Sequence, residues 1–178
     1  MELVEKLFHQ ELVELAWNFQ VSSKSCDNPE YYNNYIRLSA IGDQQKGMGV
    51  THTFVDIERN RIAGFITLRA TSLVSEGANG VKLVEPSLEI AELAVDAEYE
   101  RCGIGSELID IAIDTADELR KKYVGIRHLV VCADRSAIGF YKNKKIGFGE
   151  LSELYEVLHD GWNDECDPLY ITLPECTL

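Results

Sequence analysis

Two glycines, Gly103 and Gly105, stand at the start of a helix-like segment that follows an apolar, strand-like run at residues 89–96. Glycines at a helix N-terminus let consecutive backbone N–H groups point at one spot, and the helix dipole adds about half a positive charge there. Such a turn binds anionic phosphate without charged side chains. The sequence therefore predicts a phosphate-binding loop over residues 100–106.

Three classes of cofactor use such a loop, and two of them require residues that this chain lacks. A dinucleotide-binding loop reads Gly-x-Gly-x-x-Gly, and its third glycine would fall at Leu108. A nucleotide P-loop ends in Gly-Lys-Ser or Gly-Lys-Thr, and neither follows Gly103. The loop is therefore predicted to be of neither type.

The third class is an acyl-CoA loop, and it fits the residues better. The segment from Ile90 to Ser106 resembles the pyrophosphate loop of the GNAT superfamily of N-acetyltransferases, which reads Gln/Arg-x-x-Gly-x-Gly/Ala after a strand. Glu100 stands at the first position, where the superfamily has glutamine or arginine. Because the main donors of such a loop are backbone N–H groups, we expect acetyl-CoA (coenzyme A) to bind despite this difference.

A second segment, residues 134–148, points to the same superfamily. It is similar to the superfamily's Asn-x-x-Ala-x-x-Phe-Tyr-x-x-x-Gly-Phe helix, with one additional residue before Gly147. Asp134 replaces the usual asparagine. Both residues cap helices, but an ionised aspartate cannot donate a hydrogen bond to the cofactor.

The resemblance implies an N-acetyltransferase with acetyl-CoA as its cosubstrate. The backbone of residues 93–95 would pair with the pantetheine arm, and residues 101–106 would hold the pyrophosphate. The implied cofactor-binding residues are Leu93, Ala94, Val95, Arg101, Cys102, Gly103, Ile104, Gly105, Ser106 and Asp134. Cys102 is expected to contribute its backbone and not a reactive thiol.

Tyr141 is the first catalytic candidate. In the reaction an acceptor amine, of a small molecule or a peptide, attacks the thioester directly, and the departing thiolate needs a proton or a hydrogen bond. The resemblance implies that the Tyr141 hydroxyl lies near the thioester sulfur and supplies it.

Glu89 and Glu92 are the candidates for the general base. Their odd spacing on one strand predicts that they point to opposite faces, so that one of them reaches the acceptor. Glu89 is nearer the position of the superfamily's glutamate, and Glu92 is the reserve. An α-amine costs only about 1 kcal/mol to deprotonate at pH 7, against about 4.6 kcal/mol for a lysine-like amine, and needs little help from a base.

The remaining sequence predicts the elements that position these residues. Alternating apolar residues predict a strand over 13–21, a short helix is expected over 3–8, and Asn28-Pro29-Glu30 starts a helix that runs to about Ala40. In that helix Tyr31, Tyr32 and Tyr35 are expected to be packing residues. The other predicted elements are a hairpin of strands 50–57 and 62–71, helices 103–123 and 136–145, and strands 127–133, 148–157 and 169–173. The order is typical of a GNAT-like α/β sandwich with a mixed sheet of about six to seven strands and helices on both faces, in a single domain over residues 1–178.

Composition restricts the function further. The net charge of −13 makes nucleic acid an unlikely partner, because phosphate contacts need clustered lysine and arginine. No apolar run is long enough to span a membrane and no basic leader opens the chain, which predicts a cytoplasmic protein.

The five cysteines, Cys26, Cys102, Cys132, Cys166 and Cys176, form no C-x-x-C pair and are expected to be free thiols. The four histidines have no metal-binding spacing, so no metal is predicted.

Two other functions stay open. One is a catalytically silent acyl-CoA-binding regulatory module, suggested by Glu100 and Asp134. The other follows from residues 47–55 and 62–68, which look like the acetyltransferase toxins that modify aminoacyl-tRNA, although the negative charge disfavours them. The sequence does not define the acceptor or the oligomeric state, and a homodimer stays open.

Overall fold

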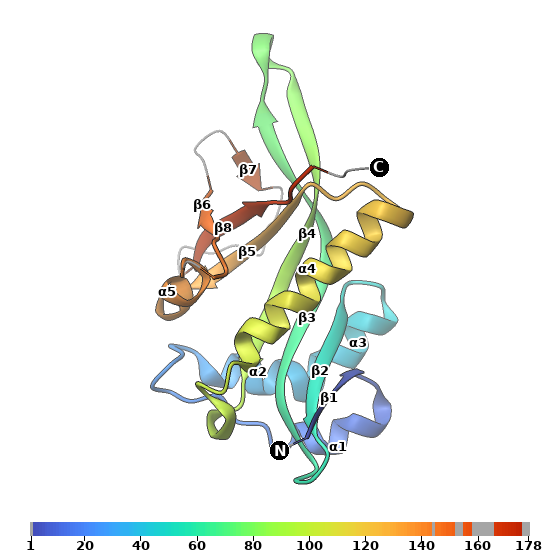
Figure 1. The fold of residues 1–178 in the computed structure, drawn as a ribbon, viewed down its shortest axis with the longest axis vertical. Helices are drawn as coiled ribbons and strands as arrows, with labels where there is room; N and C mark the ends of the chain where they lie inside the picture. The colour runs from blue at the N-terminus through green and yellow to red at the C-terminus, as the bar shows by residue number, and fades with distance from the viewer. Residues whose placement is uncertain (1, 144, 152–154, 158–165, 176–178) are drawn as a thin grey trace. The chain divides into compact units, whose positions relative to one another are not determined.

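A computed structural model describes residues 2–143, 145–151, 155–157 and 166–175 (Figure 1). The strands are β1 (Leu3–Leu7), β2 (Val50–Asp56), β3 (Arg61–Glu76), β4 (Lys82–Val95), β5 (His128–Asp134), β6 (Gly149–Glu150), β7 (Tyr155–Val157) and β8 (Cys166–Thr172). The α-helices are α1 (Val13–Ala16), α2 (Pro29–Asn34), α3 (Ala40–Gln45), α4 (Ile104–Lys122) and α5 (Ile138–Tyr141). Short 3-10 or π turns are η1 (Gln10–Leu12), η2 (Tyr35–Ser39), η3 (Ala78–Gly80), η4 (Ala97–Tyr99) and η5 (Arg135–Ala137).

The strands form one mixed sheet, which confirms the predicted α/β fold. Within the described residues, seven strands follow the order β1-β2-β3-β4-β5-β8-β6, and β7 pairs with β3 outside this order. β4 and β5 are parallel, with Ser87 opposite His128 and Ile90 opposite Val131. The β1–β2, β2–β3, β5–β8, β6–β8 and β3–β7 pairs are antiparallel.

The chain divides into two compact units. Unit 1 comprises Met1–Arg69 and Ala91–Asp110, and unit 2 comprises Ala70–Ile90 and Ile111–Leu178. Three elements, β3, β4 and α4, contribute residues to both units. That residues 1–178 form a single domain stays a prediction.

The N-terminal segment differs from the prediction at both of its elements. Residues 3–7 form the edge strand β1, which pairs with β2, instead of a helix. Residues 13–16 are helical, whereas a strand was predicted over 13–21. The buried residues of this segment are Phe8, Leu12, Ala16 and Phe19. Their spacing of four, four and three is helical, and the apparent alternation arose from residues such as Trp17 that are largely exposed.

The helix predicted from Asn28 to about Ala40 begins as expected but is longer. It continues through the π turn η2 into α3 and ends at Gln45, so that Gly42 lies inside it. Gly47, two residues after Gln45, terminates the helix. It has a positive φ of 70° and donates its N–H to the Gln44 carbonyl at 3.1 Å. The helix is therefore terminated by the second glycine, Gly47, and not by the first, Gly42.

Helices cover both faces of β3 in unit 1, as predicted. The Phe65 ring packs against Phe19, with 5.3 Å between ring centroids, and stacks on Tyr35 at 6.1 Å. The preceding residue, Gly64, faces α4, because successive residues of a strand point to opposite faces. A Cβ atom at Gly64 would lie 2.9 Å from Ile104 Cγ2.

In unit 2, strand β5 was predicted within one residue, but the helix that follows is shorter than residues 136–145. It consists of η5 and α5 and ends at Tyr141. Asn143 ends it, because its side chain accepts the N–H groups of Lys145 and Ile146 while its carbonyl accepts that of Gly147. Of the strand predicted over 148–157, β6 and β7 are described, and residues 152–154 lie outside the described residues.

No helix in the described part of the chain is long and apolar enough to cross a membrane.

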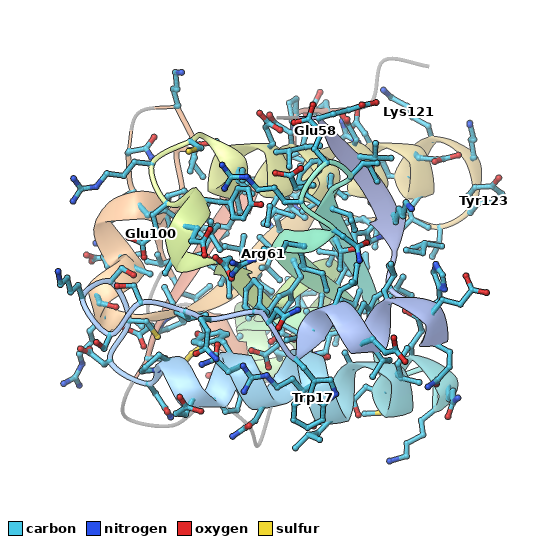
Figure 2. All side chains as sticks on the ribbon, turned by 90° about the horizontal axis from the view of Figure 1, so that it is seen from below. Trp17, Glu58, Arg61, Glu100, Lys121 and Tyr123 are labelled. Atoms are coloured by element: carbon cyan, nitrogen blue, oxygen red, sulfur yellow. A yellow bond between two sulfur atoms is a disulfide. The ribbon has the colours of Figure 1, made fainter. Side chains whose placement is uncertain are left out.

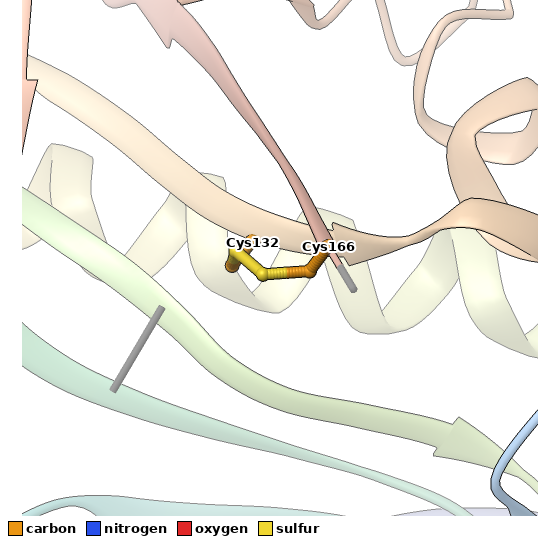
Figure 3. Close-up of a disulfide and its surroundings, with 2 residues drawn as sticks. All are labelled: Cys132 and Cys166. Atoms are coloured by element: carbon orange, nitrogen blue, oxygen red, sulfur yellow. A yellow bond between two sulfur atoms is a disulfide. The ribbon is translucent and has the colours of Figure 1, made fainter. Parts of the chain in front are cut away.

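The expectation that all cysteines are free thiols is wrong for two of them. Cys132 of β5 and Cys166, the first residue of β8, form a disulfide with a Cα–Cα distance of 5.5 Å (Figure 3). The β5–β8 register brings them together, since Asp134 lies opposite Cys166 and Cys132 lies opposite Pro168. Cys26 and Cys102 have thiols that are not in a disulfide, as predicted, and Cys176 lies outside the described residues.

Reducing this disulfide is expected to destabilise the protein substantially. The bond closes a loop with a sequence separation of 34 residues. A cross-link of that span lowers the entropy of the unfolded chain enough to stabilise the fold by about 4 kcal/mol. Denaturant unfolding of wild type with and without a thiol reductant measures the difference. The Cys132→Ser variant should match the reduced wild type and should not respond to reductant. Equal stability of oxidised and reduced wild type would contradict the prediction.

Candidate active site

The predicted phosphate-binding loop is a tight turn between β4 and α4 in unit 1. Arg101 and Gly103 both have a positive φ, of 61° and 89°. The carbonyl of Gly103 accepts the N–H groups of Ser106 at 2.9 Å and Glu107 at 3.2 Å. The first N–H groups of an α-helix have no acceptor inside the helix, so those of Ile104 and Gly105 point out of its end. This end of α4 provides the backbone donors and dipole that a pyrophosphate requires.

Open space lies in front of the loop at Gly103. A Cβ atom built on Gly103 would meet no described atom within 4 Å. Arg101 and Cys102 are exposed, whereas the Ile104 side chain is buried and anchors the first turn of α4. The loop therefore fits the pyrophosphate of acetyl-CoA, with exposed backbone outside and an apolar anchor inside.

Gly64 of β3 sets the distance between the sheet and α4. Its missing side chain lets the helix approach, because a Cβ there would lie 2.9 Å from the Ile104 side chain and 3.1 Å from Leu108. The same Cβ would lie 3.2 Å from the backbone carbonyl of Ala94, at the end of β4. Any larger residue would displace the start of α4 and thus the backbone donors of the loop.

A buried carboxylate, Asp96, holds the beginning of the loop. Its side chain accepts the backbone N–H groups of Gln20 at 3.0 Å and of Glu98 at 2.9 Å. Arg61 of β3 donates to the same carboxylate at 3.2 Å and also pairs with Glu98. Burial lowers the pKa of Arg61, but the carboxylates of Asp96 and Glu98 outweigh it and keep the pKa above its ordinary value. Figure 2 labels Arg61 near the centre of the view.

A second buried carboxylate, Asp56 of β2, holds Tyr99 of η4. The Tyr99 hydroxyl donates to Asp56 at 2.9 Å, and the backbone N–H of Arg59 donates at 3.1 Å. Burial raises the pKa of Asp56, but these hydrogen bonds outweigh it and hold the pKa below its ordinary value. The loop is thus fixed to β2 and β3 by two buried carboxylates.

Glu100, which differs from the superfamily signature, has a structural partner. Its carboxylate accepts a hydrogen bond from the Ser25 hydroxyl, in the connection between α1 and α2. Figure 2 shows Glu100 near the turn that precedes α4. The side chain joins two segments 75 residues apart in the chain. This contact explains a residue type that the sequence alone left without a role.

Replacing Glu100 with glutamine is expected to tighten acetyl-CoA binding by about two- to fivefold, because one negative charge beside a pyrophosphate costs a fraction of a kcal/mol in screened solvent. Glutamine still accepts the hydrogen bond from Ser25. Isothermal titration calorimetry with acetyl-CoA at low and high salt measures the change, and salt should reduce it. The matched control is Glu118→Gln, which removes an exposed charge near the other end of α4. Weaker binding by Glu100→Gln would show that the charge favours the cofactor.

Strand β4 carries the residues predicted to bind pantetheine. Its ladder with β5 runs from Ser87 to Ile90, and the strand continues to Val95. Leu93 and Val95 are half-buried and Ala94 is buried, so this end of the strand alternates partly exposed and buried apolar residues.

The two candidate bases are in different environments. Glu89, in unit 2, is 2% exposed. Glu92, in unit 1, is half-buried, and its Oε1 atom accepts a hydrogen bond from the Tyr31 hydroxyl at 2.6 Å. Glu92 is therefore the more accessible carboxylate.

Tyr141 lies in unit 2, at the end of α5. Its ring is buried and makes edge contacts with Phe140 and Phe148, with 5.0 and 5.6 Å between centroids. Its carbonyl accepts the N–H of Phe148 at 3.1 Å. Asp134 caps the turn before α5 as predicted, because its side chain accepts the N–H of Ser136 at 2.9 Å. These contacts fix the backbone from which the Tyr141 hydroxyl extends.

The structure thus brings most of the predicted cofactor residues together in unit 1. Unit 1 holds Glu92, residues 93–95 and residues 101–106, whereas unit 2 holds Glu89, Asp134 and Tyr141. The sequence interpretation missed Asp96 and Arg61 as anchors of the loop, and it treated Tyr31 as packing. No local pattern marks these residues. In the described ranges, no group of three histidine, cysteine, aspartate or glutamate side chains could hold a metal ion.

The fold and this loop define a class of enzyme, and a family comparison identifies it. The family model described as acetyltransferase (GNAT) family matches residues 9–148. The chain therefore belongs to the acetyltransferase (GNAT) family. It is an acyl-CoA-dependent N-acetyltransferase with acetyl-CoA as its cosubstrate. No curated protein matches the sequence.

Solved structures with the same fold include bacterial toxins. A tyrosine-to-phenylalanine mutant of the AtaT toxin, bound to the C-terminus of the antitoxin AtaR and acetyl-CoA, is 18% identical with a TM-score of 0.71 and covers 97% of this chain and 94% of its own. AtaT complexed with acetyl-methionyl-tRNAfMet is 16% identical with a TM-score of 0.72, at 96% and 95% coverage. A tyrosine-to-phenylalanine mutant of KacT is 16% identical with a TM-score of 0.73, at 97% and 95% coverage. At these identities the likeness concerns the fold.

Proposed function

We propose that the enzyme transfers the acetyl group of acetyl-CoA to a primary amine by direct attack. The amine nitrogen forms a bond to the thioester carbonyl carbon, and the carbon–sulfur bond breaks. The amine loses one proton and the coenzyme A thiolate gains one. The observation that carries this proposal is the phosphate-binding turn between β4 and α4 in a chain of the acetyltransferase family.

Each predicted site residue has a role in this proposal. The backbone of residues 93–95 pairs with the pantetheine arm, and residues 101–106 bind the pyrophosphate. Tyr141 donates to the departing thiolate, and Asp134 holds the turn before it. Glu92 replaces Glu89 as the first candidate for the base, because Glu89 is 2% exposed and Glu92 is more accessible.

Two measurements test the proposal. Calorimetry should detect acetyl-CoA binding, and no binding at high micromolar concentration would reject it. Thiol release should then be followed with amino acid amides, polyamines, lysine peptides and aminoacyl-tRNA as acceptors. An enzyme releases thiol with at least one of these amines, whereas a silent acyl-CoA-binding module binds acetyl-CoA and releases none.

A second candidate acceptor is the α-amine of an aminoacyl-tRNA. It is favoured by the fold, which matches a structure of AtaT complexed with acetyl-methionyl-tRNAfMet, and by the small cost of deprotonating an α-amine. The net charge of −13 opposes it. Acetylation of aminoacyl-tRNA with a strong dependence on salt would support this acceptor, and acetylation of free amines alone would exclude it. That nucleic acid is an unlikely partner, and that the protein is cytoplasmic, stay predictions.

A further inference from the structure

A buried histidine of unit 2, His128, lies between a carboxylate and an exposed hydroxyl. Its Nε2 atom lies 2.6 Å from Glu85 Oε2, and its Nδ1 atom lies 3.0 Å from Thr172 Oγ1. The imidazole is 1% exposed, whereas Thr172, the last residue of β8, is exposed. All three residues belong to unit 2, and none of them has a role in the proposed acetyl transfer.

The register of three adjacent strands produces this arrangement. β5 lies between β4 and β8 in the sheet (Figure 1). His128 of β5 lies opposite Thr172 of β8 in an antiparallel pair, and opposite Ser87 of β4 in a parallel pair. Glu85 precedes Ser87 by two positions, so the two side chains share one face of the sheet. The carboxylate, the imidazole and the hydroxyl are therefore positioned by strands and not by a loop.

The contact with Glu85 determines which nitrogen of His128 carries the hydrogen. A carboxylate accepts hydrogen bonds and donates none, so Nε2 of a neutral imidazole donates to Glu85. The other nitrogen, Nδ1, then directs its lone pair at the Thr172 hydroxyl. Arg127 holds the carboxylate in place, with its Nε atom 2.8 Å from Glu85 Oε2. The Tyr170 ring packs against the imidazole, with 5.6 Å between ring centroids.

A hydroxyl in this environment is suited to nucleophilic attack. A threonine hydroxyl is a weak nucleophile by itself, and an adjacent base that takes its proton activates it. The base needs a third group that fixes its tautomer and orientation, as the carboxylate does in a hydroxyl–histidine–carboxylate triad. The two contacts of His128, at 2.6 and 3.0 Å, have the lengths that this proton transfer requires. Because Thr172 is exposed, an acyl donor can reach its hydroxyl.

We propose that Thr172, His128 and Glu85 form a second reactive site, at which the Thr172 hydroxyl accepts an acyl group from a thioester or an aryl ester. The Thr172 Oγ1 atom forms a bond to the carbonyl carbon, and the carbon–sulfur or carbon–oxygen bond of the donor breaks. The hydroxyl proton passes to His128 Nδ1 and then to the departing thiolate or phenolate. The products are an acyl-threonine ester and a free thiol or phenol.

Mass spectrometry of the acetylated protein tests the site directly. The probes are p-nitrophenyl acetate, an aryl ester, and S-acetyl-N-acetylcysteamine, a thioester without a pyrophosphate. Wild-type protein is digested after timed exposure to each probe, and the acetylated fraction of each peptide is measured. Ser23, an exposed hydroxyl between α1 and α2, is the internal control. Thr172 should be acetylated at least about 100-fold faster than Ser23 with at least one probe, as expected for assistance by a general base.

Variants at both ends of the triad test the role of His128. Thr172→Val keeps the shape of the side chain and should abolish acetylation at this position. Because His128 itself is buried, its role is tested through Glu85, whose side chain is 23% exposed. Glu85→Gln should slow acetylation of Thr172 at least about tenfold, because the amide can donate to Nε2 and so favours the wrong tautomer. Glu76→Gln, at the exposed end of β3, is the matched control and should not change the rate.

The results separate this site from the proposed acetyltransferase function, because neither probe contains coenzyme A. Acetylation of Thr172 no faster than that of Ser23 with both probes overturns the site. Acetylation by the aryl ester alone supports the site and overturns the thioester as its donor. Thermal unfolding checks that Glu85→Gln is folded. An unchanged rate in the folded variant overturns the role of His128 and Glu85.

Discussion

Replacing Tyr141 with phenylalanine is expected to lower kcat about 100-fold and to leave the Kd of acetyl-CoA within about twofold. A positioned acid contributes about 10²- to 10⁴-fold to a proton transfer. The lower end applies here, because a thiol with a pKa of about 8.5 is a good leaving group even without a full proton. The aromatic contacts of Tyr141 with Phe140 and Phe148 do not involve the hydroxyl and should persist.

Thiol release under saturating acetyl-CoA and amine measures kcat, and calorimetry measures the cofactor affinity. Tyr170→Phe, on β8 of the same unit, is the control for loss of a phenol and should retain kcat. Thermal unfolding of Tyr141→Phe checks that the fold is intact. An unchanged kcat in a folded variant would show that Tyr141 packs only, and a lost acetyl-CoA affinity would assign it to binding.

Replacing Asp96 with alanine is expected to destabilise the protein by about 3 kcal/mol or more, because removing one partner of a buried ion pair leaves the other charge poorly compensated. The Asp96 side chain is fully buried and that of Arg61 is 24% exposed. Arg61 Nε already lacks a hydrogen-bond partner among the described residues. The variant would also free the N–H groups of Gln20 and Glu98.

Denaturant unfolding measures this loss, and acetyl-CoA titration measures its effect on the loop. Glu98→Gln is the matched control, because Glu98 pairs with the same arginine but is 53% exposed. An exposed pair contributes about 1 kcal/mol or less, so this variant should be nearly as stable as wild type. Equal destabilisation by the two variants would show that burial of the Asp96–Arg61 pair is not what stabilises the loop.

The parts of the fold that the sequence predicted well depend on neighbouring residues. The loop and α4 were found because Gly103 and Gly105 precede a regular helical spacing of apolar residues. The cap at Asp134 is equally local. The N-terminal segment was misread because Trp17 is exposed, so the alternation around it did not reflect burial.

The parts that were not predicted depend on residues far apart in the chain. The Cys132–Cys166 disulfide requires the register of β5 with β8, which no spacing of cysteines indicates. Tyr31 was treated as packing, because Glu92, its partner, comes 61 residues later. A single sequence gives the residue types of such pairs but not their proximity.

The attachments of the phosphate-binding loop limit how it could be transplanted. The loop is recognised from adjacent residues, yet Gln20 and Arg61 reach Asp96 from 76 and 35 residues away, and Ser25 reaches Glu100 from 75. Residues 96–106 grafted into another sheet would carry the backbone donors without these attachments. The smallest portable piece that keeps the shape of the loop is therefore most of unit 1, including its N-terminal helices.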